Sequence, residues 1–191
     1  SYTVYSAAFK QAGIVAASNF EELFDITKVA VLQPPSKGNR IAMVTNGAGP
    51  CVMAADQSVD YGVEIADYEP KTYDDLKSKL SPFCVIGNPV DLTGSATSHD
   101  YETAIEALLQ DGNVDAVMPF FVFQDTPLDE GIVDVIAKSN KRGKPIICCA
   151  SGGEYTRRMS SIIESHGVPV YPIPERAMAA VQALVRLGQS R

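Results

Sequence analysis

The stretch Arg40–Pro50, with the sequence RIAMVTNGAGP, decides the fold class of this chain. Its first six residues, Arg40–Thr45, are mostly apolar and predict a buried β-strand. Gly47 and Gly49 let the backbone turn tightly, and Pro50 has the dihedral angle that suits the first turn of a helix. The stretch therefore predicts a strand that runs through a short loop into a helix, which is the repeating unit of an α/β sheet.

The same alternation of strands and helices continues to the C-terminus. Val114–Phe123 has no polar alternation, which is typical of a strand covered on both faces. Strands and helices that alternate with short connections predict a doubly wound, mainly parallel α/β sheet flanked by helices. The other expected strands are Val63–Ala66, Phe83–Ile86, Pro145–Ala150 and Val168–Pro172, and the expected helices are Pro50–Tyr61, Thr72–Leu80, Asp100–Gln110, Leu128–Lys141, Glu154–His166 and Pro174–Leu187.

A helical arm is expected before the first strand. The apolar spacing predicts a helix over Tyr2–Ala12. Ser18–Glu21 is a candidate capping box, in which the serine hydroxyl and the glutamate carboxylate satisfy amides at the start of a second helix. The Pro34–Asn39 stretch then interrupts the pattern. We therefore expect residues 1–39 to form a helical arm and linker, and residues 40–191 to form the sheet domain.

The composition excludes several classes of protein. The chain has 191 residues, 46% hydrophobic and 20% charged, which is typical of a globular protein and not of a disordered or collagen-like one. Its formal net charge of −7 would repel the phosphate backbone of nucleic acids, so no nucleic-acid partner is expected. No apolar run approaches the roughly 20 residues that span a bilayer, so no membrane partner is expected.

The four cysteines and two histidines form no recognisable metal or catalytic pattern. The cysteines lack CxxC spacing, and neither His99 nor His166 stands near them in a ligand pattern. Cys84, Cys148 and Cys149 lie in apolar runs, so we expect them to be small buried hydrophobic residues. Unpaired thiols favour a reducing compartment, which predicts a cytoplasmic protein.

Candidate ligand-binding residues follow the strands, because open parallel sheets bind ligands at the carboxyl ends of strands, near helix N-termini. The loop Asn46–Pro50 lacks the Lys-Ser/Thr ending of a P-loop. Val52 stands where a dinucleotide-binding fingerprint needs its third glycine. The loop is therefore either a place where the backbone approaches another kind of ligand closely or a tight turn without a ligand.

The third predicted strand is followed by a polar segment, Gly87–Gly94. Asn88, Asp91 and Thr93 bring an amide, a carboxylate and a hydroxyl together within a few residues. Pro89 restricts the residue before it to extended conformations. The segment is either part of a binding site or an Asx turn whose side chains bond only to the local backbone.

The fourth predicted strand ends in another polar loop, Gln124, Asp125 and Thr126. Thr126 is a natural N-cap, and Pro127 suits the first helical position after it. The loop is either a simple helix cap or a third part of the same sheet edge.

Several segments, in order along the chain, resemble the NDP-forming acyl-CoA synthetases, whose type member is the ADP-forming acetyl-CoA synthetase. The resemblance covers nearly the whole chain, and the ordered set is more specific than any one motif. It identifies the chain as similar to the second ligase-CoA domain, a flavodoxin-like sheet related to the C-terminal domain of the succinyl-CoA synthetase beta subunit. The segments are Val4–Gly13 (VYSAAFKQAG), Ile41–Pro50 (IAMVTNGAGP), Ala54–Asp56 (AAD), Asn88–Gly94 (NPVDLTG), Gly167–Tyr171 (GVPVY) and Pro174–Ala177 (PERA).

The resemblance implies the reaction acyl-CoA + phosphate + ADP ⇌ acid + CoA + ATP, through an acyl phosphate and a phosphohistidine. CoA, ADP or ATP, and Mg belong to the complete enzyme, in which CoA-binding, first ligase and ATP-grasp domains are the partners and an oligomer is expected. This chain alone is expected to bind none of these cofactors and to be inactive. The family's phosphohistidine lies in a Ser-His-Thr-Gly segment, expected upstream of Ser1, so His99 and His166 are not assigned that role.

The resemblance also implies the site residues. In the related domain an asparagine in an Asn-Gly-Ala-Gly loop contacts the acyl substrate, and by motif this asparagine is Asn46. A helix-start loop two strands later maps to Phe123–Thr126, where this sequence lacks the glycines of the succinyl enzyme. The expected substrate- and phosphate-binding residues are Asn46, Gly47, Ala48, Gly49, Asn88, Asp91, Thr93, Gln124, Asp125 and Thr126.

Two other functions are compatible with the sequence. The same domains occur, without the phosphohistidine, in bacterial protein lysine acetyltransferases, so a non-catalytic region of such an enzyme is the main alternative. The intact Asn88–Gly94 motif favours the synthetase. An independent flavodoxin-like oxidoreductase is the third hypothesis, and flavin absorbance would indicate it.

Overall fold

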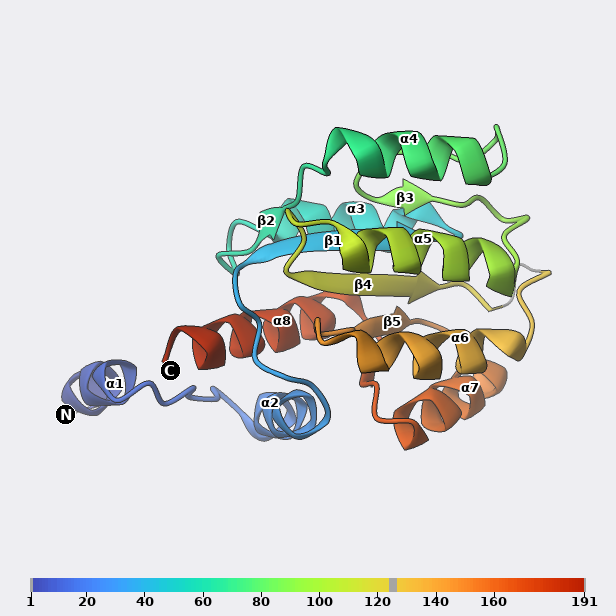
Figure 1. Ribbon diagram of the computed structural model, residues 1–191. Coiled ribbons are helices and arrows are strands. Elements are labelled where there is room, and N and C mark those ends of the chain that lie inside the picture. The colour runs from blue at the N-terminus through green and yellow to red at the C-terminus, as the bar shows by residue number, and fades with distance from the viewer. Residues whose placement is uncertain (1, 124–126, 191) are drawn as a thin grey trace.

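A computed structural model describes residues 2–123 and 127–190 (Figure 1). The helices are α1 (Tyr2–Gln11), α2 (Phe20–Leu32), α3 (Ala48–Gln57), α4 (Pro70–Lys79), α5 (Ser98–Gln110), α6 (Gly131–Ser139), the 3-10 turn η1 (Asn140–Arg142), α7 (Glu154–Ser165) and α8 (Pro174–Gln189). The strands are β1 (Arg40–Thr45), β2 (Glu64–Ile65), β3 (Val90–Asp91), β4 (Ala116–Phe121), β5 (Cys148–Ala150) and β6 (Val170–Tyr171).

The strands form one parallel sheet in the order β2-β1-β4-β5-β6, and β3 also pairs with β1. β2 and β3 share the outer edge of β1, because β2 pairs with its first residues and β3 with its last. The two short strands together therefore occupy one position, and the order corresponds to the flavodoxin-like arrangement. The predicted doubly wound α/β fold is confirmed.

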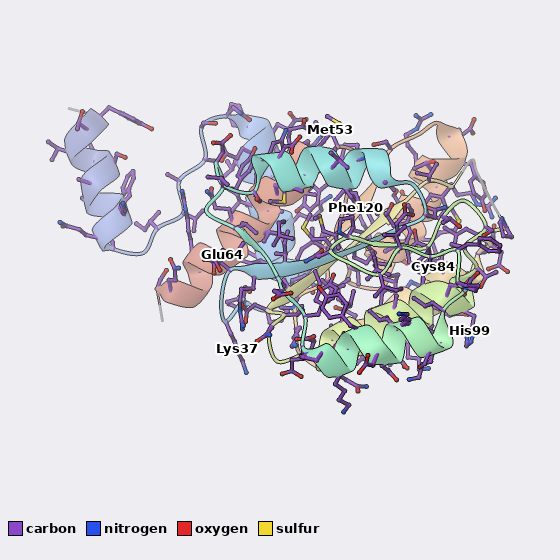
Figure 2. All side chains as sticks on the ribbon, turned by 90° about the horizontal axis from the view of Figure 1, so that it is seen from above. Lys37, Met53, Glu64, Cys84, His99 and Phe120 are labelled. Atoms are coloured by element: carbon purple, nitrogen blue, oxygen red, sulfur yellow. The ribbon has the colours of Figure 1, made fainter. Side chains whose placement is uncertain are left out.

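Each face of the sheet is covered by its own set of helices. Side chains of β1 and β4 alternate between the two faces, as expected of strands buried on both sides. Ile41 and Met43 pack with α2, α3 and α8, whereas Ala42 and Val44 pack with α4 to α7. In Figure 2 Phe120 of β4 lies within this packed interior. Two hydrophobic cores thus hold the sheet rigid between them.

The third strand is not where the sequence predicted it. β3 begins at Val90, and of the predicted strand Phe83–Ile86 only Val85 makes a bridge, which is antiparallel and to Asp91. The motif Asn88–Pro89 therefore precedes this strand instead of following it. The apolar residues at 83–86 were misleading because Phe83 and Val85 are exposed on a loop, not buried in the sheet.

Helix α2 begins one residue later than the predicted capping box implies. Asn19 is the N-cap, and its side chain accepts a hydrogen bond from the Glu22 amide at 2.9 Å. The Glu22 carboxylate in turn accepts from the Ser18 amide at 2.6 Å. Asparagine is as good an N-cap as serine, so Asn19 takes the role that was predicted for Ser18. Glu22 takes the role that was predicted for Glu21. The other predicted elements differ from the observed ones only in their ends.

Candidate functional site

The candidate site lies at the carboxyl ends of β1 and β4, where the order of strands reverses. From β1 the chain continues to β2 on one side, and it later returns to β4 on the other. Such a switch point opens a crevice between the two loops that leave the neighbouring strands, and open α/β sheets bind ligands there. The described residues that leave these strands are Asn46 and Gly47 after β1 and Val122 and Phe123 after β4.

Asn46 joins these two strand ends. Its side chain is only 3% exposed. The Oδ1 atom accepts a hydrogen bond from the Val122 amide at 2.9 Å, and Nδ2 donates to the Val122 carbonyl at 3.0 Å. The amide of Asn46 thus extends the pairing of β1 and β4 beyond the last strand residues. This pairing fixes the separation of the two loops.

Tyr101 of α5 supports the same junction and was not predicted as a site residue. Its hydroxyl lies 2.6 Å from the Phe120 carbonyl, to which it donates, and 3.0 Å from Asn46 Oδ1. Burial raises the pKa of Tyr101 well above its usual value, so the hydroxyl keeps its proton at neutral pH. In the sequence Tyr101 looks like any apolar helix residue, and only the fold brings it to Asn46.

The turn from β1 into α3 ends at the N-terminus of that helix. Thr45 Oγ1 donates to the Gly47 carbonyl at 2.8 Å and accepts from its amide at 2.9 Å, which holds the turn. A Cβ atom on Gly47 would lie 2.8 Å from Val122 Cγ2, so a larger residue would push the two loops apart. Within the described residues no side chain caps α3. The main-chain N–H groups of Ala48 and Gly49, at the positive end of the helix dipole, therefore face this edge.

Asp91 and Thr93 lie beside the end of β1, as predicted. Asp91 pairs with Thr45, and its Oδ1 atom accepts from the Thr93 amide at 2.9 Å. The Asx turn that was the alternative interpretation is therefore present. Thr93 also has a φ of 65°, a left-handed conformation that is rare for a β-branched residue. Strain of this kind often accompanies functional sites, so the turn and a binding role are compatible.

Asn88 points into the sheet instead of toward the edge. Its Oδ1 atom accepts from the Met43 amide at 2.9 Å, and Nδ2 donates to the carbonyls of Ile41 at 2.7 Å and Ala66 at 3.0 Å. The side chain replaces main-chain pairing in the gap between β2 and β3. The structure thus separates Asn88 from Asn46, Asp91 and Thr93, which share the edge.

The third predicted loop is described only at its two ends. Gln124, Asp125 and Thr126 lie outside the described residues, so their predicted role stays a prediction. Phe123, directly before them, is buried and packs edge-on against Tyr155, with ring centroids 6.1 Å apart. The expected helix start at Leu128 is wrong, because α6 begins at Gly131.

The described residues offer neither a thiolate nor a metal-ligand cluster at this edge. Cys51, Cys148 and Cys149 are buried, and burial raises the pKa of Cys149 to about 12. The thiols therefore stay protonated and unreactive at neutral pH. No group of three or more His, Cys, Asp or Glu side chains in residues 2–123 and 127–190 is arranged to hold a metal ion. His99 is exposed beside Glu102, at the same end of the molecule as Cys84 (Figure 2).

The fold and this edge define a flavodoxin-like α/β domain with the N-terminus of α3 at its switch point. The family model of the ligase-CoA domain matches residues 41–190. The chain therefore belongs to the ligase-CoA domain family, and the resemblance in the sequence motifs is confirmed.

Similar proteins include ADP-forming acetate–CoA ligases. The alpha subunit of acetate–CoA ligase II from Pyrococcus furiosus is 38% identical and matches all of this chain with 42% of its own length. Acetate–CoA ligase I from Archaeoglobus fulgidus is 36% identical over 99% of this chain and 27% of its own. The chain thus spans less than half the length of these relatives.

One solved structure is similar to this chain in both fold and sequence. It is the dinucleotide-forming acetyl-coenzyme A synthetase 1 of Ca. Korarchaeum cryptofilum, in complex with phosphate and ADP. Its TM-score is 0.87 and its identity 31%, over all of this chain and 42% of that one. In the part of our chain that the structure describes, no helix is long and apolar enough to cross a membrane.

Proposed function

We propose that this chain is the second ligase-CoA part of an ADP-forming acyl-CoA synthetase, and that it contributes acyl and phosphate contacts. The proposed reaction is acyl-CoA + phosphate + ADP ⇌ acid + CoA + ATP. The observation that carries the proposal is the N-terminus of α3, which no described side chain caps, at the switch point next to the strand ends that Asn46 joins. Membership of the ligase-CoA family and the acetate–CoA ligases among its relatives support it.

The N-terminus of α3 suits an anion that must later leave. Two adjacent main-chain amides and the helix dipole provide about half a positive charge without a lysine or arginine. A phosphoryl group or an acyl phosphate would be held by hydrogen bonds, and release would not require separation of a full ion pair. Among the described residues no atom lies within 4 Å of the place where a Gly49 Cβ would stand, so a ligand would be able to approach the backbone there.

Different roles follow for the predicted site residues. Ala48 and Gly49 would contact the anion through their amides, and Gly47 would keep the loop close to Val122. The Thr93 hydroxyl, which lies 3.1 Å from Ser95 Oγ, is a candidate donor from the other side of β1. Asn46 and Asn88 act mainly as positioning residues, because their amides bond to strand backbone. We also propose that Gln124, Asp125 and Thr126 contact the substrate or the phosphate.

The cofactors and partners are assigned to the rest of the enzyme. The sequence contains no Ser-His-Thr-Gly segment, so the phosphohistidine would be supplied from outside these 191 residues. CoA, ADP or ATP would bind to the CoA-binding and ATP-grasp parts. Mg, which accompanies nucleotide phosphates, is assigned to the ATP-grasp part as well. A cytoplasmic location is part of the proposal.

The substitution Gly49→Ala in the complete synthetase tests the proposal. The added Cβ would meet no atom of the described residues within 4 Å, and alanine favours the helix by about 0.5–1 kcal/mol, so the free energy of unfolding should stay equal or rise. The methyl group would stand where the anion approaches. We expect the apparent affinity for acyl phosphate to fall by about tenfold, or about 1.4 kcal/mol.

The unfolding measurement is the control for this variant. Weaker binding together with unchanged stability supports a ligand at α3. Unchanged kinetics for the acid and the acyl phosphate would remove the N-terminus of α3 from the site.

A further inference from the structure

The outward side of α2 carries large apolar side chains that nothing in the described part of the chain covers. Phe20 is 81% exposed, Phe24 71% and Val31 77%, and Leu23 is also exposed. These four residues, which we call the outer face of α2, lie on one side of the helix because their spacing follows the helical period. None of them is charged.

Helix α1 is exposed to an even greater degree. None of its residues is buried, and Tyr2, Tyr5 and Phe9 recur at the spacing of one helix face. Figures 1 and 2 both show α1 apart from the sheet. An isolated helix of ten residues is marginal in water, so α1 needs a surface to pack on.

The opposite side of α2 is held firmly on the sheet domain, so the outer face cannot turn inward. Arg176 of α8 donates to both carboxylate oxygens of Asp25, at 2.6 and 2.7 Å. Tyr171 donates to the Asp25 carbonyl at 2.9 Å. Lys28 donates to Glu164 at 2.7 Å and lies 4.2 Å from the centre of the Tyr171 ring. These contacts set the rotation of the helix.

The exposed apolar side chains of α2 form a patch comparable in size to the largest that soluble monomers carry. A buried aromatic side chain of this size covers roughly 150–250 Å². Phe20 and Phe24 alone approach the few hundred Å² of contiguous apolar surface that a monomer typically exposes. Leu23 and Val31 enlarge the patch. Such patches mark interfaces, whose centres are apolar and poor in charge.

We propose that the outer face of α2, together with α1, docks another domain of the same synthetase through an apolar surface of that domain. This inference rests on the proposed function. The extent of the similarities indicates the occupant, because the ligase-CoA family model begins at residue 41 whereas the acetate–CoA ligase relative matches the whole chain. The two helices are thus shared with the longer enzymes but lie outside the domain that the family defines.

The lengths of the relatives support the same occupant. This chain accounts for 42% of the Pyrococcus furiosus subunit and 27% of the Archaeoglobus fulgidus enzyme, so each has further domains that could provide the covering surface. A second copy of this chain is the competing occupant. A second copy would cover the outer face of α2 in a sample of this chain alone. Another domain would cover it only in the complete synthetase.

Thiol labelling of Phe24→Cys distinguishes them. The variant is prepared in this chain and in the complete synthetase, and its rate of reaction with a maleimide is measured at several protein concentrations. Lys77→Cys is the matched control, because Lys77 is an exposed residue of α4, a helix on the far side of the sheet in Figure 1. Each parent protein, without the added cysteine, gives its own background, to which Cys84 contributes because it is only partly buried.

We expect the Phe24→Cys thiol to react about tenfold or more slowly in the complete synthetase than in this chain, since burial protects against access. The Lys77→Cys thiol should react equally in both. Val31→Cys repeats the test at a second position of the outer face. Fast reaction in both proteins, or equal slowing of the control, would overturn the proposal. Slow reaction in this chain that depends on concentration would assign the face to a second copy and overturn it as well.

Synthetase activity of the unsubstituted complete enzyme is measured separately. An active enzyme in which the Phe24→Cys thiol reacts fast contradicts the docking proposal and leaves the function intact. An inactive enzyme in which this thiol is protected contradicts the function and leaves the docking intact.

Discussion

Asn46 is buried because its amide completes the hydrogen bonding of a neighbouring strand end. The sequence places it correctly after β1, since the glycines and the proline that follow it are local signals of a turn. Its partner Val122 is 76 positions away, so no local pattern could indicate this pairing. The same reason explains why Tyr101 and the sheet-filling role of Asn88 were missed, as both depend on contacts between distant strands and helices.

The substitution Asn46→Asp should affect both stability and binding. The carboxylate cannot donate to the Val122 carbonyl, so we expect a loss of about 1–3 kcal/mol in the free energy of unfolding. A negative charge near an anionic substrate should also weaken its apparent affinity, since two charges about 4 Å apart repel by roughly 4 kcal/mol at an effective dielectric of 20. Unfolding and steady-state kinetics of the complete synthetase measure the two effects.

Asn46→Ala is the uncharged control: it removes both hydrogen bonds to Val122, whereas aspartate can still accept from the Val122 amide. A lower affinity in the Asp variant than in the Ala variant indicates that the charge faces the substrate. Equal affinities for the acid and the acyl phosphate in all three proteins would place Asn46 away from the ligand.

At the level of elements, the starts of β1 and β4 are held together by one ion pair. Arg40 Nε donates to Asp115 Oδ2 at 2.9 Å, and the Arg40 amide donates to the same atom at 3.0 Å. Burial alone would raise the pKa of Asp115, but the hydrogen bonds and charge of Arg40 outweigh it and lower this pKa below its usual value. A Cβ on Gly38 would lie 2.4 Å from Asp115 Oδ2, which explains the glycine there.

The lowered pKa of Asp115 predicts how stability depends on pH. A carboxyl group with a lower pKa in the folded state stabilises the fold above its unfolded pKa of about 4, and this contribution is lost as the pH falls through the folded value. Asp115→Asn should therefore reduce the free energy of unfolding at pH 7 by about 1 kcal/mol. The difference from the parent should vanish in acid. Denaturant titrations between pH 7 and pH 2 measure it, and a difference that does not change with pH would contradict the assignment.

The separation of residues 1–39 from the sheet domain stays a prediction, and the contacts suggest where to test it. The Gln33 side chain donates to the Gly167 carbonyl at 2.8 Å. Ser36 is buried, and its main-chain amide donates to the Leu184 carbonyl at 3.1 Å. By contrast, the segment between α1 and α2 contains several exposed residues. We therefore expect limited proteolysis to cut residues 12–18 before the Pro34–Asn39 stretch.

Truncated chains complete this test. Removal of residues 1–18 should leave the unfolding transition of the sheet domain nearly unchanged. Removal of residues 1–39 should lower its midpoint, because Asp25, Val29 and Gln33 leave buried partners behind. A domain that unfolds at the same temperature without residues 1–39 would show that the whole arm is independent.

For the whole molecule, the alternation of strands and helices was predictable because each element has a local period and local end signals. β3 was not, since its two residues stand in a polar segment, and the apolar run before it, Phe83–Ile86, has Phe83 and Val85 exposed outside the sheet. The meeting of the two strand ends at the candidate edge was predictable in outline, because parallel strands bring their carboxyl ends together wherever they occur. Its individual contacts required the three-dimensional neighbours.

The assignment of cofactors to other domains predicts that this chain alone binds neither CoA nor ATP with micromolar affinity. The glycine loop after β1 lacks both the P-loop lysine and the third glycine of a dinucleotide site. Isothermal titration calorimetry with each ligand checks this, and the complete synthetase is the positive control. Micromolar binding to the isolated chain would contradict the assignment of parts.

The sharing of one edge position by β2 and β3 also bears on aggregation. Long unpaired edge strands are templates onto which another chain can add a strand. Here both edges of the sheet carry strands of two residues, and Pro89, which has no amide hydrogen, stands just before β3. An incoming strand would find only short, interrupted rows of donors and acceptors. The split edge thus protects the protein against edge-to-edge association even when its covering helices open transiently.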